Sequence, residues 1–257
     1  MSIIIKSEEE IEIMRESGLI NAEVRNVLYH TIEEGISGIE LDNIARKEIE
    51  SRGGTPTFPG YSPFNKPPYP GAICFSVNHQ LVHGIPSKYI LQNGDIVSID
   101  LGVTYRNYVS DAAFTKGVGV ISKKALDLIN TTKNAMEAGI KELIDGNFLG
   151  NVSNAIEIHA KNYGIIREYG GHGVGRNMHE DPHVPNYGSK NSGIKIQKGM
   201  VLAIEPMLAL GSIENHEDED QWTVVMTDHS LAAHFEETVA ITDDKPYILT
   251  KKENNGE

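Results

Sequence analysis

Apolar positions near the start of the chain recur with the spacing of a helix. They are separated by seven, four and three residues and therefore share one face: Ile13, Ile20, Val24 and Val27. Ser7 followed three residues later by Glu10 is a capping box, which predicts that the helix begins there. A second helix is expected over residues 39–52, because the pair Gly53-Gly54 ends the next helical pattern.

Short runs rich in β-branched residues predict strands. Residues 73–77 form one such run, and residues 95–104 and 108–116 form two more that are expected to pair as a hairpin. Near the other end of the chain, residues 222–226 and 234–242 are expected to make another strand pair.

Two segments are predicted to lack regular structure. Residues 54–71 hold six of the eleven prolines, which cannot donate to a ladder, so this stretch is expected to be a loop. Residues 214–220 are strongly acidic and read as a solvated loop, since clustered like charges repel one another.

One stretch of sequence occurs twice. Residues 91–100 and residues 196–205 share a Gln, then a Gly, then an apolar run that closes on Ile and a carboxylate. The carboxylates are Asp100 in the first copy and Glu205 in the second. Because an unpaired buried carboxylate is costly, two of them at matching places suggest that a cation lies between them.

The order of predicted elements also recurs. After Ser122 the chain repeats helix, helix, strand, His-Gly, strand with acid, strand with acid. The repetition predicts an α+β fold with pseudo-twofold symmetry, an antiparallel sheet and helices on one side of it. We expect a single domain, 1–257, made of two related halves at about 5–120 and 121–250.

The repeat pairs residues that commonly ligate metals: His83 with His172, Asp100 with Glu205, and Asp111 with Glu236. Asp100 and Asp111 fall on adjacent strands of one hairpin, so both can face the same side. Four carboxylates with at least one imidazole suit two divalent ions, and this donor set favours Mn, Fe(II), Co or Zn. Such a pair of ions holds a hydroxide that attacks a carbonyl.

Composition restricts the protein's setting and partners. The 257-residue chain is 39% hydrophobic and 23% charged, as is usual for globular proteins, and no apolar run reaches the length of a membrane helix. With Cys74 as the only cysteine, no intramolecular disulfide can form, and a cytoplasmic protein is expected. The formal charge of −13 argues against DNA binding.

Other motifs give weaker alternatives. His179-Glu180-Asp181-Pro182-His183 matches the zinc pattern HExxH, but that motif needs a helix and Pro182 interrupts it. Gly171 to Gly175 resembles a phosphate-binding loop with the wrong spacing and no convincing helix after it. A serine-hydrolase elbow is missing, and Cys74, a possible nucleophile, is more often a packed small hydrophobe in such a strand.

Five motifs together closely resemble type I methionine aminopeptidases, in that family's order and across about residues 5–250. They are Val82-His83-Gly84-Ile85-Pro86, Gly94 to Asp100, Gly171-His172-Gly173-Val174-Gly175, Ile204-Glu205-Pro206-Met207 and Phe235-Glu236. The resemblance implies the pita-bread α+β fold, whose internal symmetry agrees with the repeat.

The resemblance also implies roles for individual residues. Asp111 and Glu236 would bridge two divalent ions, Asp100 would chelate one, and His172 with Glu205 would hold the other. Glu205 would also shuttle a proton, while His83 and His179 would contact the scissile peptide. The substrate's methionine side chain would enter an apolar pocket, for which the candidates are Phe58, Tyr61, Tyr69, Cys74, Met178 and Trp222.

The chain departs from the family pattern in places. His79-Gln80 follows Asn78 where the family usually has Glu, Glu237 stands where it commonly has His, and the 62–70 loop is longer than usual. Glu237 adds negative charge beside a predicted ligand.

The expected function is hydrolytic removal of the initiator methionine from peptides and nascent chains with a small second residue, by a cytoplasmic monomer. Transient association with the ribosome would require a local basic patch on this acidic protein. The alternatives are an X-Pro peptidase of the same fold, which the short chain disfavours, and a non-catalytic pita-bread binding module, which should have lost ligands.

Overall fold

The structure is a computed structural model that describes residues 3–243 and 245–252. The ends of the predicted domain, residues 1–2 and 253–257, lie outside the described residues, as does residue 244.

Within the described residues, four long helices form where the sequence predicts helical structure. They are α1 (Glu8–Thr31), α2 (Gly38–Ser51), α3 (Lys123–Lys141) and α4 (Leu149–Ala160). The capping box at Ser7 and Glu10 is confirmed: the Ser7 hydroxyl accepts from the Glu10 amide, and the Glu10 carboxylate accepts from the Ser7 amide. Ser37 and Glu40 cap α2 in the same way. These caps fix where α1 and α2 begin.

The predicted hairpin is the central feature of the first half. β4 (Ile96–Tyr105) and β5 (Tyr108–Gly117) pair antiparallel along their whole length, and β4 also pairs with β2 (Cys74–Val77) and β1 (Thr55–Pro56). The segment 54–71 is therefore not wholly irregular, because its first residues extend this sheet and residues 63–65 form a 3-10 turn.

A five-stranded antiparallel sheet is the main sheet of the second half. Its order is β15 (Pro246–Ile248), β14 (Glu237–Ile241), β9 (Val201–Ile204), β7 (Gly171–Gly173) and β8 (Glu180–Val184). Backbone bonds between Ala113, within β5, and Glu236, the residue before β14, connect this sheet to the hairpin of the first half. The two halves thus meet at strands that carry predicted ligands.

Two three-stranded sheets complete the fold. One contains β13 (Ala232–His234), β10 (Met207–Ala209) and β6 (Gly164–Ile165), and the other contains β11 (Asn215–Glu217), β12 (Val224–Met226) and β3 (Gln80–Val82).

The expected pairing of residues 222–226 with 234–242 is wrong. β12 pairs with β3 from the first half and with β11, and β14 pairs with β9 and β15. The edges that the two segments would have offered each other are therefore occupied by other strands. Residues 214–220 are mostly exposed, as expected, although Asn215–Glu217 are in a strand and not a loop.

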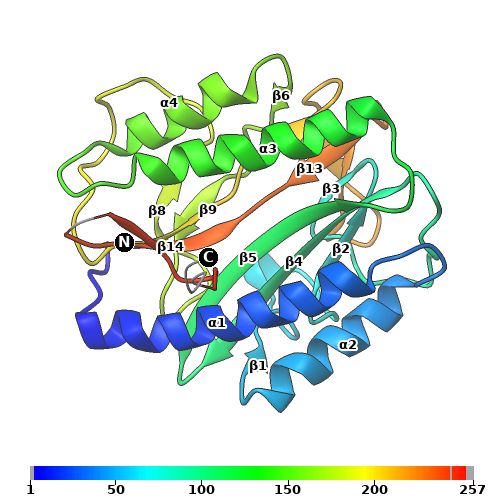
Figure 1. Cartoon of the computed structure of the whole chain (residues 1–257), viewed down its shortest axis with the longest axis horizontal. Coiled ribbons are helices and arrows are strands. Elements are labelled where there is room, and N and C mark those ends of the chain that lie inside the picture. Colours follow the sequence, from blue (N-terminus) through cyan, green and yellow to red (C-terminus); the bar gives the residue numbers. More distant parts are fainter. Residues whose placement is uncertain (1–2, 244, 253–257) are drawn as a thin grey trace, which may run out of the picture.

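The helices cover the strands as two pairs. Figure 1 shows α1 beside α2 and α3 beside α4, with α1 packed on β4 and β5 and α3 on β13, β10 and β9. One large apolar cluster runs through both halves and includes Leu28, Ile99, Leu128 and Ile204. The α+β class predicted from the sequence is confirmed.

The first helix is bound to the last described residues of the chain. The Arg15 guanidinium donates to the carbonyl oxygens of Ile248 (3.1 Å), Leu249 (2.7 Å) and Lys251 (2.7 Å). Gly18 allows this approach, because a Cβ there would lie 2.2 Å from the Leu249 oxygen.

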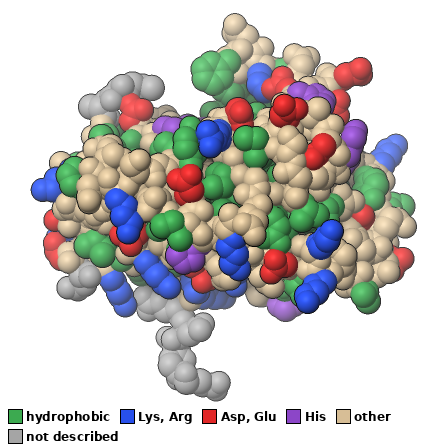
Figure 2. Space-filling view, turned by 90° about the horizontal axis from the view of Figure 1, so that it is seen from above, with side chains coloured by type: hydrophobic (Ala, Val, Ile, Leu, Met, Phe, Trp, Pro, Cys, Tyr) green, Lys and Arg blue, Asp and Glu red, His purple; other side chains and the backbone are tan. Residues whose placement is uncertain are grey.

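Acidic and basic side chains lie interspersed over the face seen in Figure 2. Among residues 3–243 and 245–252, no helix combines the length and the hydropathy that crossing a bilayer requires.

Candidate metal centre

The five predicted metal ligands line one cavity of about 780 Å³, although they come from both halves of the chain. Asp100 lies on β4, Asp111 on β5 and His172 on β7, while Glu205 follows β9 and Glu236 precedes β14. The strands of both main sheets therefore contribute to a common centre.

The hairpin register places the two aspartates on one face. Asp100 of β4 lies opposite Ala113 of β5. Two residues later on β4, Gly102 lies opposite Asp111, which is two residues before Ala113 on β5. Because side chains alternate along a strand, Asp100 and Asp111 point to the same side. Their carboxyl groups interact directly with one another.

Asp111 is held by the second half of the chain. Its amide donates to the Thr238 hydroxyl (2.9 Å), and that hydroxyl donates to the Asp111 carbonyl (2.8 Å). These bonds join β5 to β14, next to the backbone bonds between Ala113 and Glu236. Asp111 and Glu236 are 3% and 2% exposed, so both carboxyl groups are fixed in a dry environment.

Glycines make room for His172 in the sheet. A Cβ at Gly171 would lie 2.2 Å from the Ala203 oxygen, and one at Gly173 would lie 2.3 Å from the Asp181 oxygen. The His172 ring donates from Nδ1 to the Gly173 carbonyl (2.9 Å), which leaves Nε2 with its lone pair. Nε2 lies 3.5 Å from Glu205 Oε1 and 3.9 Å from Glu236 Oε1.

Burial makes this cluster electrostatically unfavourable without a cation. Burial, and then the charge of Glu205, raise the pKa of Asp100 to about 7. Burial and neighbouring carboxylates hold the pKa values of Asp111, Glu205 and Glu236 well above their ordinary range. Burial lowers the pKa of His172 to about 3, so this imidazole is neutral and able to ligate.

Several polar atoms in the cluster fit a bound cation. Asp100 Oδ1, Asp111 Oδ1 and Glu236 Oε1 are buried and have no hydrogen-bond partner among the described residues. Such atoms are costly unless they are satisfied, and carboxylate oxygens with imidazole nitrogens are ordinary ligands of divalent metals. The donor set therefore suits metal ions.

The structure adds one residue that the sequence analysis missed. Two sets of three potential ligands share Glu236: one adds Asp111 and His172, and the other adds Glu205 and His234. Within each set, the ligand atoms lie within 4.8 Å of one another. The sequence pattern places His234 only at the start of the predicted strand 234–242. Its position two residues before Glu236, where alternation favours the same side, is a signal that could have identified it.

The two histidines predicted to contact the substrate also line the cavity. His83 follows β3 and packs edge-on against Trp222 and Tyr169, and burial lowers its pKa to about 4. A Cβ at Gly84, the next residue, would lie 2.2 Å from the Phe75 oxygen, so only glycine lets this turn lie against β2. His179 lies at the exposed rim, where the Tyr61 hydroxyl is 2.8 Å from its Nδ1.

The structure brings all six predicted pocket residues together beside the ligands. Four form a buried apolar cluster, and the other two pack against it: Phe58, Tyr69, Cys74 and Trp222, with Tyr61 and Met178. The Trp222 indole donates to the Pro67 carbonyl (2.9 Å), and the Tyr69 hydroxyl donates to the Gly84 carbonyl (2.8 Å). These bonds hold the Trp222 indole and the Tyr69 ring in fixed orientations at the cavity wall.

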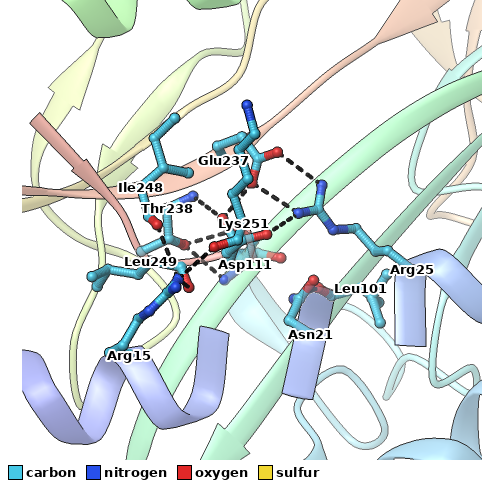
Figure 3. A network of polar contacts seen from close by, with 11 residues as sticks. Arg15, Asn21, Arg25, Leu101, Asp111, Glu237, Thr238, Ile248, Leu249 and Lys251 are labelled. Atoms are coloured by element: carbon cyan, nitrogen blue, oxygen red, sulfur yellow. Dashed lines mark hydrogen bonds and ion pairs between the residues drawn. The ribbon is translucent and has the colours of Figure 1, made fainter. Parts of the chain in front are cut away.

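Glu237 does not leave an uncompensated charge beside the centre. Figure 3 shows the Arg25 side chain reaching from α1 to Glu237, with bonds of 2.8 Å and 3.2 Å to its two oxygens. Thr250 also donates to the Glu237 carboxylate, and Arg25 to the Thr250 carbonyl. The Arg25 cation therefore neutralises the charge of Glu237, which departs from the family pattern.

The alternative motifs have other roles. Residues 180–183 of the HExxH pattern belong to β8, and Glu180 pairs with Lys6 at 2.7 Å, so no helical zinc site forms there. Gly171–Gly173 form β7 in the middle of a sheet and not a phosphate loop.

The chain is similar over nearly its whole length to curated methionine aminopeptidases. The sequence profile of metallopeptidase family M24 matches residues 12–243. The chain is 44% identical over 251 residues to the methionine aminopeptidase of Clostridium acetobutylicum, with 96% of this chain and 98% of the relative covered. It is 45% identical to methionine aminopeptidase 1 of Bacillus subtilis, with 97% and 99% covered.

Solved structures agree with this relationship. Methionine aminopeptidase from Thermotoga maritima matches with a TM-score of 0.94 and 38% identity, over 98% of this chain and all of that chain (100%). Prolidase from Pyrococcus furiosus matches with a TM-score of 0.75 and 25% identity, over 98% of this chain and 66% of that chain. The expected pita-bread fold is confirmed, and the chain belongs to metallopeptidase family M24 and, within it, to the type I methionine aminopeptidases.

Proposed function

We propose that this methionine aminopeptidase binds two divalent cations, Co, Mn, Fe(II) or Zn, and uses them to release the initiator methionine when the second residue is small. Asp100, Asp111, His172, Glu205 and Glu236 would hold the cations, with Asp111 and Glu236 shared between the two. When bound, the cations neutralise the clustered carboxylates and acidify a water that attacks the first peptide carbonyl.

The chain's own side chains move the proton and orient the peptide. Glu205 is half-buried at the cavity wall, where one of its carboxylate oxygens accepts the proton of the attacking water and passes it to the leaving amine. His83 and His179 lie on the same cavity and contact the carbonyl oxygen as negative charge develops on it.

The apolar wall selects the methionine side chain. Phe58, Tyr69 and Trp222 are each 3–5% exposed and meet edge to face, so they form a rigid boundary. An unbranched thioether fills such a boundary and contacts ring edges favourably. Cys74 and Met178 add apolar surface, and Tyr61 positions His179 through their hydrogen bond.

A single observation carries this proposal: buried carboxylate oxygens without partners face one another in a cavity that also has an apolar aromatic wall. The test is release of free methionine from Met-Ala-x peptides with Mn or Co added, with X-Pro peptides assayed beside them. The likeness to prolidase makes X-Pro cleavage the specific alternative.

The Asp111→Asn variant sharpens the test. The Thr238 bonds to the Asp111 backbone do not involve the substituted group, so the fold should remain while turnover is nearly abolished. Normal turnover by this variant, or release of proline peptides alone, would refute the proposal.

The setting of the enzyme is also proposed. We expect one catalytic domain of two related halves, acting as a cytoplasmic monomer on N-terminal methionine of peptides and nascent chains. Contact with the ribosome would be transient, because the net charge of −13 opposes stable binding to RNA.

A further inference from the structure

His234 is held rigidly at the end of β13, where it pairs with Met207 of β10. Its amide donates to the Thr115 hydroxyl (2.9 Å), and that hydroxyl donates to the His234 carbonyl (2.8 Å). The residue is 3% exposed and lines the cavity that holds the five predicted ligands. These bonds therefore fix the His234 backbone beside the cavity.

The ring nitrogen of His234 that faces the acids is unsatisfied. Nε2 is buried and has no hydrogen-bond partner among the described residues. The nearest carboxylate oxygen in an ion-pair contact is Glu205 Oε2, at 3.4 Å. This separation exceeds the usual range of about 2.7–3.2 Å for a hydrogen bond from nitrogen to oxygen.

The same separation fits two ligands of one cation. Two ligand atoms that each lie about 2.1 Å from one metal ion are roughly 3.0–3.6 Å apart when the angle between them at the metal is about 90–120°. Glu205 is flanked by imidazoles on both sides, since His172 Nε2 lies 3.5 Å from its Oε1 and His234 Nε2 lies 3.4 Å from its Oε2. The ligand atoms of Glu205, His234 and Glu236 lie within 4.8 Å of one another.

We propose that His234 Nε2 is a further metal ligand, bound to the cation that Glu205 and Glu236 hold. This inference rests on the proposed dinuclear centre and adds a second imidazole to it. Nitrogen ligands favour metals late in the Irving–Williams series, so the centre should prefer Zn or Co over Mn more strongly than a centre with one imidazole.

X-ray absorption of the zinc-loaded protein tests the ligand count directly. With two equivalents of Zn²⁺ bound, two ligating histidines give an average of about one imidazole per zinc, whereas His172 alone gives about one half. We expect about one for the unmodified protein and about one half for His234→Gln, which removes the ring and keeps a polar side chain. His79→Gln is the matched control, because His79 lies outside the cavity lining, and its zinc spectrum should be unchanged.

Affinity provides a second measurement. Chelator competition should show zinc binding at least about tenfold weaker in His234→Gln than in the His79→Gln control. Two bound zinc ions with about half an imidazole each in the unmodified protein would overturn this inference and leave the dinuclear centre intact. Failure of the unmodified protein to take up zinc, cobalt or manganese would overturn the proposed centre itself. Because the spectrum of the unmodified protein decides the count, the test does not depend on the stability of the variant.

Discussion

The ion pair between Arg25 and Glu237 should be among the strongest polar contributions to stability. The two side chains are only 13% and 14% exposed. Both terminal nitrogens of the Arg25 guanidinium donate hydrogen bonds to the two carboxylate oxygens of Glu237. In Arg25→Met, Glu237 keeps its hydrogen bond from Thr250 but loses its cation. Leaving one charge of a buried pair uncompensated costs about 3–5 kcal/mol, and the residual exposure of this pair lowers the expectation to about 2–4 kcal/mol.

Urea unfolding of the metal-free protein measures this cost. A loss of about 2–4 kcal/mol corresponds to a fall in Tm of roughly 5–15 °C for a chain of this size. The double variant Arg25→Met with Glu237→Gln should recover much of the loss, because the buried charge is gone.

The exposed pair of Arg106 and Glu16 provides the matched control. Its atoms are 3.5 Å apart and its side chains are 56% and 48% exposed, so Arg106→Met should cost less than about 1 kcal/mol. If Arg25→Met were no more destabilising than this control, the reasoning from burial would be refuted.

The site supports four further predictions. Because Asp100 has a pKa of about 7 in the fold and about 3.9 when unfolded, the metal-free protein should lose stability as pH rises from about 4 to about 7. Metal binding near pH 6 should release protons, and calorimetry in two buffers that shows no release would contradict this. Burial raises the pKa of the Cys74 thiol well above its ordinary range, so native protein should react with a thiol reagent far more slowly than unfolded protein. Tyr61→Phe should lower kcat/KM roughly fivefold, the equivalent of one hydrogen bond of about 1 kcal/mol, while Tyr163→Phe should not.

Local signals in the sequence were sufficient for the helices and the main hairpin. The Ser7 capping box and the helical spacing of apolar residues specify α1 without help from distant contacts. The internal repeat identified Asp100 and Glu205 as related acids, and the structure places both on one cavity. A duplicated pattern thus carries information about spatial neighbours that a single copy lacks.

Contacts that depend on distant segments were not predictable in the same way. β12 has three residues, too few for its pattern to specify a partner, and its neighbour β3 comes from the other half of the chain. Arg25 and Glu237 are 212 positions apart, so nothing local indicates that the Glu237 charge is neutralised. His234 lacked a counterpart in the repeat and was overlooked for that reason.

The contact between Arg15 and the carbonyl oxygens of residues 248–251 determines when α1 can reach its final packing during translation. The helix that contains Arg15 leaves the ribosome more than two hundred residues before its acceptors do. A partly made chain therefore holds α1 without its final anchor, and a stop codon shortly before Ile248 would loosen a helix encoded more than two hundred codons upstream.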